Sequence, residues 1–156
     1  ACADRGVLAP RVGDREAELL ARIRASTGTV RRDAQVELAR LYVLSGEKKV
    51  EDGYKLALQV AAEKDPLPAS RALAVAGDYW YRKGNLVEAA RQFLEAAATG
   101  ARDAELAASS IYRAAEMMRL ADRPEDLGEL VLRLEKSFPS SPWTARARKL
   151  AGEAGQ

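Results

Sequence analysis

Few side chains of this 156-residue chain belong to types that carry out acid–base, nucleophilic or metal chemistry. The sequence has no histidine and a single cysteine, Cys2, which excludes histidine-based triads, histidine-ligated metals and a disulfide within the chain. Gly-rich phosphate loops and nucleophile elbows are also missing from it. The candidate carboxylates for proton transfer are Glu88, Glu95, Asp103 and Glu105. Nothing in their spacing predicts that two of them meet in a cleft, as general acid–base catalysis would require. We therefore expect no catalysis, no cofactor and no metal site.

The charges of the chain are nearly balanced, with 25 basic and 23 acidic residues and a net charge of +2. The two signs are interspersed, as in Arg31-Arg32-Asp33, whereas a nucleic-acid-binding protein usually gathers its positive charge on one stripe. We therefore expect protein or peptide partners and no nucleic acid. No stretch reaches the roughly 20 apolar residues that cross a bilayer, so we expect contact with a membrane only through a lipid anchor.

Cys2 directly follows Ala1, and this pair resembles the end of a bacterial lipoprotein signal, where small residues precede the cysteine that is lipidated. Residues 3–13 have no helical period and contain two glycines and a proline, so we expect residues 1–13 to form a flexible tether. The resemblance implies a lipid anchor at Cys2 and a place in the bacterial cell envelope, on the periplasmic side of the outer membrane. If Cys2 is an ordinary thiol, a cytoplasmic location stays open.

The elements that must position any functional side chain are helices. Hydrophobic residues make up 47% of the sequence and aromatic residues 6%, and helix-forming alanine, leucine, arginine and glutamate dominate. A large residue recurs at a constant interval along the chain, preceded three positions earlier by a small one; the large residues are Tyr42, Trp80 and Met118, and the small ones are Ala39, Gly77 and Ala115. A fixed period of this length indicates a helical repeat in which each unit buries its apolar face against its neighbours.

Residues 69–100 form the clearest unit, because small and aromatic residues recur at the spacings of a tight helical hairpin. The positions are, in order, Gly77, Trp80, Gly84, Ala89, Phe93 and Ala96. This pattern resembles the tetratricopeptide repeat, in which small residues let two antiparallel helices approach closely and aromatic ones fill the crossing. We also expect Gly84 to end the first helix in a left-handed conformation, and Asn85 with Glu88 to form a capping box for the second.

The other units keep the register with fewer matching residues. In residues 31–64 the turn between the two helices is about two residues longer. In residues 104–138 the turn lacks its glycine, and Pro124 suits the first position of the second helix. A leading helix at 14–27 and a closing helix at 141–154 would cover the two ends of the array.

We therefore expect residues 14–156 to form one all-α domain, a tetratricopeptide-like solenoid of helical hairpins with about eight antiparallel helices. A plain helical bundle is the alternative fold. Leu20 and Ile23 would form the apolar face of the leading helix. We expect Trp80 and Phe93 to belong to the core and not to a binding surface.

The stretch from Phe138 to Trp143 reads aromatic-Pro-x-Ser-Pro and continues into an alanine-rich helix. This join is similar to bacterial envelope tetratricopeptide proteins, which include the lipoprotein of the outer-membrane β-barrel assembly machinery and the periplasmic coordinators of cell division. The similarity implies a non-catalytic scaffold for protein–protein interaction, and it agrees with the interpretation of Cys2.

In the tetratricopeptide family the first helices of successive units line a concave groove that holds a peptide or a partner protein. We assigned the groove-facing positions of the family to the first helix of each unit in this sequence. The candidate groove residues are Arg40, Arg71, Asp78, Tyr81, Arg82, Tyr112, Glu116 and Arg119, with Val43, Leu44 and Ser109 beside them. Tyrosine and arginine often anchor partners. We expect Tyr81 and Tyr112 to matter most, and Arg82 and Arg119 to hold a carboxylate.

Two other functions stay open at this point. One is a structural subunit of a multiprotein envelope complex, or a self-associating assembly, without a peptide groove. The other is an enzyme, which a deep pocket lined by carboxylates would favour. The sequence leaves the identity of the partner and the oligomeric state open.

Overall fold

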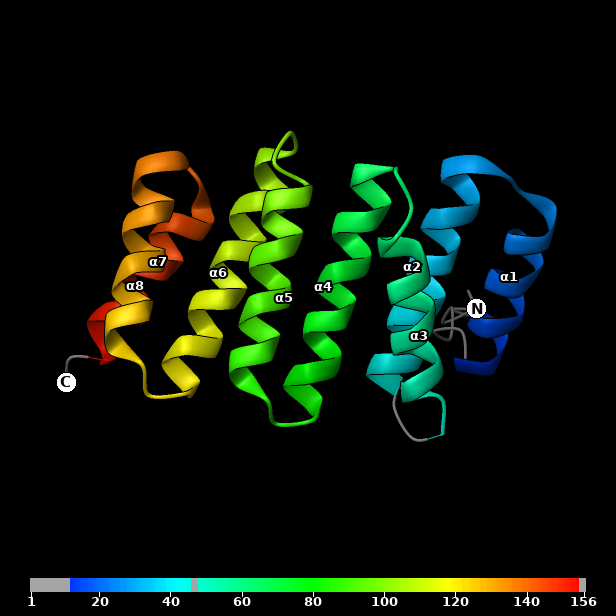
Figure 1. Cartoon of the computed structure of the whole chain (residues 1–156), viewed down its shortest axis with the longest axis horizontal. Coiled ribbons are helices and arrows are strands. Elements are labelled where there is room, and N and C mark those ends of the chain that lie inside the picture. Colours follow the sequence, from blue (N-terminus) through cyan, green and yellow to red (C-terminus); the bar gives the residue numbers. More distant parts are fainter. Residues whose placement is uncertain (1–11, 46–47, 155–156) are drawn as a thin grey trace, which may run out of the picture.

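The chain folds into eight α-helices and no strand within the residues that the computed structural model describes, which are 12–45 and 48–154. The helices are α1 (Val12–Ala25), α2 (Gly28–Ser45), α3 (Val50–Ala61), α4 (Pro66–Arg82), α5 (Leu86–Thr99), α6 (Ala104–Leu120), α7 (Pro124–Ser137) and α8 (Pro142–Ala154). They stand side by side along the longest axis of the molecule, with α1 at one end and α7 and α8 at the other (Figure 1). Each helix packs on the next in the chain, and α2 also packs on α4, and α6 on α8. The expected all-helical fold is confirmed.

The helices repeat with the period of the sequence. The even-numbered helices α2, α4, α6 and α8 begin at residues 28, 66, 104 and 142, which are equally spaced. Helices α5 and α7 begin at residues 86 and 124, one such interval apart. Helix α3 begins at residue 50, slightly later than this period would place it, in agreement with the longer turn expected in the first unit.

Two helices end in the same way one period apart. Helix α4 ends at Arg82 and is followed by Gly84, whose φ of 76° is left-handed, and the amide of Asn85 donates a hydrogen bond to the carbonyl oxygen of Trp80 at 3.0 Å. This is the helix end that glycine favours, and the expectation for Gly84 is confirmed. Helix α6 ends at Leu120, and the residue equivalent to Gly84 in this unit, Asp122, takes a φ of 54° without being a glycine. Aspartate is one of the few residues that tolerate this conformation.

Only half of the capping box expected at the start of α5 forms. The side chain of Asn85 accepts a hydrogen bond from the backbone amide of Glu88 at 3.1 Å, as expected of an N-cap. The carboxylate of Glu88 does not turn back to Asn85. It accepts hydrogen bonds from Arg91 at 2.6 Å and from Gln92 at 3.0 Å, because the arginine offers a charge-assisted bond one helical turn away.

The small residues of the repeat lie where helices cross. A Cβ atom added to Gly77 would lie 2.5 Å from Cε1 of Phe93, which is completely buried on α5. In the first unit, a Cβ atom on Gly53 of α3 would lie 2.7 Å from the carbonyl oxygen of Ala39 on α2. Ala115 of the third unit is also completely buried. The small residues of the period therefore lie at helix crossings where a larger side chain would meet a neighbouring helix.

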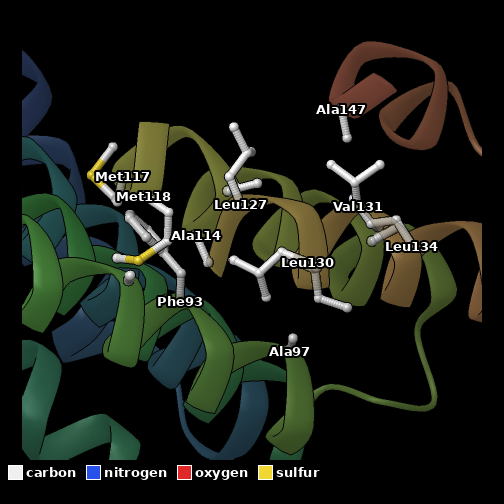
Figure 2. Close-up of a cluster of buried hydrophobic side chains, with 14 of the residues drawn as sticks. Phe93, Ala97, Ala114, Met117, Met118, Leu127, Leu130, Val131, Leu134 and Ala147 are labelled. Atoms are coloured by element: carbon white, nitrogen blue, oxygen red, sulfur yellow. The ribbon is translucent and has the colours of Figure 1, made fainter. Parts of the chain in front are cut away.

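The hydrophobic core is divided into clusters that follow one another along the molecule. The largest lies among α5, α6, α7 and α8, and Figure 2 shows its side chains, including Phe93, meeting between these helices. A second cluster lies among α2, α3 and α4, and a third between α1 and α2. Trp80, which is half-buried, packs against the first two clusters, and Leu56 packs against the second and third. These two residues make the core continuous.

Helix α1 is rotated slightly from its expected orientation. Leu19 is its buried residue, with 1% of its surface exposed, whereas Leu20 and Ile23 are only partly buried at the edges of the same contact. Leu20 and Ile23 therefore belong to the apolar face, as expected, but Leu19, which the expectation omitted, is its centre. Since α2 is the main packing partner of α1 among the described helices, with Leu56 of α3 beside the same cluster, a narrow stripe centred on Leu19 is sufficient.

We predict opposite effects for one substitution at two helical glycines. Gly77→Ala is expected to lower the free energy of unfolding by about 1–2 kcal/mol, because strain against the buried ring of Phe93 exceeds the gain in helix propensity. At Gly128 on α7, no atom lies within 4 Å of an added Cβ. Gly128→Ala is therefore expected to raise the free energy of unfolding by about 0.5–1 kcal/mol. Urea unfolding followed by circular dichroism measures both. A Gly77→Ala protein more stable than the wild type would contradict the close approach.

Candidate functional site

A hollow of about 260 Å³ lies over the first helices of three successive units. It is lined by residues 33–40 of α2, 71–78 of α4 and 106–113 of α6, and we call it the central hollow. The first two segments are one repeat period apart, so equivalent parts of successive units form its sides. Several residues expected in a groove do line it; they are Arg40, Arg71, Asp78 and Ser109.

A second hollow of about 610 Å³ continues the first toward α1. It is lined by Arg15 and Leu19 of α1 and by residues of α2 between Glu37 and Ser45, and we call it the α1–α2 hollow. Glu37 and Arg40 line both hollows. The two together therefore form one surface that extends from α1 across α2 and α4 to α6, and we call this surface the groove.

Ion pairs connect neighbouring helices across the groove. Arg71 of α4 lies 3.2 Å from a carboxylate oxygen of Asp33 of α2, and the separation of these residues in the chain, 38 positions, is one repeat period. Arg15 of α1 lies 2.5 Å from a carboxylate oxygen of Glu37 of α2. All four side chains are partly exposed, so solvent screens both pairs and they add little stability. Their main effect is to fix the positions of charge along the groove.

The pair between Asp78 and Arg113 differs because the carboxylate is buried. Asp78 has only 6% of its surface exposed, and its Oδ1 accepts a hydrogen bond from the guanidinium of Arg113 on α6. The same guanidinium carbon lies 4.3 Å from the centre of the Phe93 ring, which is a cation–π contact. Asp78, expected on an exposed face, is instead buried beneath the hollow, because an arginine from the next unit supplies the partner that a buried charge requires.

Tyr81 and Arg82 lie at the C-terminal end of α4 and line neither hollow. Tyr81 is 47% exposed. Arg82, expected to hold a peptide carboxylate, donates hydrogen bonds from Nη1 to the backbone carbonyl oxygens of Val43 at 2.6 Å and Leu44 at 3.0 Å. It therefore satisfies carbonyl groups near the end of α2, where a positive charge is favourable.

Tyr112, Glu116 and Arg119 lie outside both hollows, and Tyr112 contacts α8. The rings of Tyr112 and Trp143 have centres 5.3 Å apart, and the guanidinium carbon of Arg146 lies 4.6 Å from the centre of the Trp143 ring. Burial raises the pKa of Tyr112 above its usual value of 10.0, and the neighbouring Glu116 carboxylate raises this pKa further. The rings of Tyr112 and Trp143 thus join α6 to α8.

The groove also contains residues that the sequence analysis missed. Arg113 and Glu37 line it from equivalent positions of two units, with one unit between them. Asp33 and Arg71 carry opposite charges at an interval of one period, which is a signal that the sequence offered. A search for charged residues one period apart, in addition to large and small ones, would have predicted the ion pair between Asp33 and Arg71.

Comparison of the chain with protein-family models, with curated proteins and with solved structures found no match. Cys2 lies outside the described residues, as does most of the expected tether. None of the described helices is both long enough and apolar enough to span a membrane. In the same part of the chain, no group of three or more cysteine or acidic side chains is placed to hold a metal ion.

We predict that Tyr112 makes the protein less stable in alkali. Above its ordinary pKa of 10.0 the unfolded side chain releases its proton while the folded one keeps it, so unfolding becomes more favourable as pH rises toward the folded pKa. Tyr112→Phe removes this contribution. The variant is therefore expected to lose less unfolding free energy than the wild type between about pH 8 and about pH 11.

Urea midpoints measured across this pH range test the prediction. Between about pH 6 and about pH 8 the tyrosine is protonated in both states, so the two proteins should show parallel curves there. Tyr42 and Tyr79 also have raised pKa values, chiefly through burial, and they should leave some alkaline loss in the variant. Equal alkaline losses in both proteins would show that Tyr112 titrates alike in the folded and unfolded states.

Proposed function

We propose that this chain is a tetratricopeptide-like solenoid that serves as a non-catalytic protein-binding scaffold of the bacterial cell envelope. Its partner is a peptide segment or a protein that lies in the groove. The observation that carries the proposal is the continuity of the groove over α1, α2, α4 and α6, the last three of which begin at equivalent positions of the repeat. Repeats stacked in this way present an extended surface rather than an enclosed active site.

The tetratricopeptide assignment is supported by the packing of the second unit. Gly77 and Phe93 meet at the crossing of α4 and α5, and Ala89 and Ala96 are completely buried on the second helix. The repeat period is longer than the usual length of about 34 residues in this family, by about one helical turn. A longer unit with looser outer repeats is consistent with the absence of a family match.

Binding is favoured over catalysis by the way the groove holds its charges. Its carboxylates among the described residues belong to Asp33, Glu37 and Asp78, and each is bonded to an arginine from a neighbouring helix. General acid–base catalysis needs a carboxylate that is free to approach a substrate proton. Paired carboxylates instead form a fixed polar surface, which suits recognition of a partner.

The envelope location rests on the sequence alone. Its two supports are the Ala1–Cys2 pair and the stretch from Phe138 to Trp143, both of which resemble envelope lipoproteins or envelope tetratricopeptide proteins. A scaffold attached by Cys2 would hold its partner near the inner face of the outer membrane.

We predict that filling the central hollow abolishes peptide binding. Ser109 is partly buried and lines the hollow on α6, so Ser109→Trp would occupy much of its 260 Å³. Peptides selected from a random displayed library on the wild-type protein should bind this variant at least about tenfold more weakly, measured by fluorescence anisotropy. Ser137→Trp places the same side chain at an exposed position at the end of α7 and should bind like the wild type.

Circular dichroism melting shows whether both variants are folded before binding is compared. Equal affinity of folded Ser109→Trp and the wild type would place the peptide outside the central hollow and contradict the proposal. A library that yields no binding peptide, together with an oligomer by light scattering, would favour the structural-subunit alternative instead.

We predict that Cys2 carries a lipid in a bacterial host when the protein is expressed with a lipoprotein signal. Metabolic labelling with an alkyne fatty acid should mark the wild type and place it in the membrane fraction. Cys2→Ser should be unlabelled and appear in the soluble periplasmic fraction, because the thiol is the site of attachment. An unlabelled wild type would remove the envelope part of the proposal and leave the groove unaffected.

A further inference from the structure

Among the residues that the structure describes, the arginines of the groove outnumber its carboxylates by one. In this part of the chain four arginines line the two hollows, Arg15, Arg40, Arg71 and Arg113, and the carboxylates lining them are the three already described. Three of these arginines are engaged by those carboxylates. Arg40 has no ion pair or hydrogen bond with any residue that the structure describes. It is exposed and lines both hollows, so the surplus charge lies where they join.

The arrangement around Arg40 explains why no carboxylate among the described residues reaches it. Glu37 precedes it by one helical turn, a spacing at which a carboxylate and an arginine often pair. Both carboxylate oxygens of Glu37 are turned toward α1 instead, with Oε2 at 2.5 Å from Arg15 and Oε1 at 3.7 Å from Arg22. Asp78, the equivalent of Arg40 one period later, bonds to Arg113. The guanidinium of Arg40 therefore has its donors available to a partner.

An apolar surface lies one helical turn from Arg40. Leu44 follows it by four residues on α2, is 51% exposed and lines the α1–α2 hollow together with Leu41. Residues four apart on a helix are separated by about 6 Å along its axis. In an extended peptide, side chains two residues apart point to the same side and are about 6–7 Å apart. A strand lying along α2 could therefore contact Arg40 and Leu44 with alternate side chains.

Resting on the proposed function, we propose that the groove recognises an extended, acidic segment of a partner protein. An aspartate or glutamate of the segment bonds to Arg40, and an apolar residue two positions away covers Leu44. Arginine suits this role because its planar guanidinium forms two parallel hydrogen bonds with a carboxylate. The apolar contact adds affinity by removing the exposed leucine from water.

Selection from a random peptide library on the wild-type protein tests this inference. The recovered peptides should be enriched in an acidic residue spaced by one position from an aliphatic or aromatic one. A synthetic peptide of this pattern should bind Arg40→Glu at least about tenfold more weakly than the wild type, because attraction is replaced by repulsion. The same peptide with lysine in place of its acidic residue should prefer Arg40→Glu, which reverses the charge pattern.

The matched control is Arg133→Glu, which makes the same charge change at an exposed position on α7 outside both hollows. It should bind like the wild type, and circular dichroism melting should show all three proteins folded. Recovered peptides without an acidic residue, or equal binding by Arg40→Glu, would overturn this inference and leave the proposed function standing. If no peptide were recovered, both would fail.

Discussion

The ring of Phe93 is the contact on which both the core and the groove depend. It lies against the backbone of Gly77, where a side chain would not fit, and this allows α4 and α5 to approach closely. The guanidinium of Arg113 lies over the same ring and bonds to Asp78, the residue that follows Gly77 in the chain. Contacts among α4, α5 and α6 therefore form a closed circuit. Because Phe93 is buried in the core, these contacts fix the position of Asp78, which lines the central hollow.

Much of the fold follows from the sequence because packing in this molecule is local and repeats. The period found in a few large and small side chains is also the interval at which α2, α4, α6 and α8 begin. Details that depend on a single neighbour were harder to predict. Asp122 takes a left-handed conformation at a turn where the pattern lacked its glycine, and Leu19 rather than Leu20 is buried on α1. Asp122 lies one period after Gly84, but its residue type does not by itself indicate a left-handed turn, and α1 lies outside the repeated units.

The candidate site was predicted less completely, because exposure on a helix does not reveal what the next helix supplies. Arg40 and Arg71 lie in the groove, as their register predicts. Asp78 occupies the position equivalent to Arg40 but is buried, since Arg113 reaches it from α6. Arg82 satisfies carbonyl groups of α2 that no sequence pattern identifies as needing a partner. Contacts made by long side chains between neighbouring units are thus the part of the site that the sequence does not predict.

Helix α8 begins one repeat period after α6, as α4 and α6 begin one period after α2 and α4. This regular spacing suggests how such a chain could change its length during evolution. Each described helix packs on those nearby in the chain, and the core is a succession of clusters joined by Trp80 and Leu56. Gain or loss of a whole unit by gene duplication or deletion would then disturb only the junction where it occurs. The span of the groove would change in steps of one hairpin, while the existing units would keep their packing.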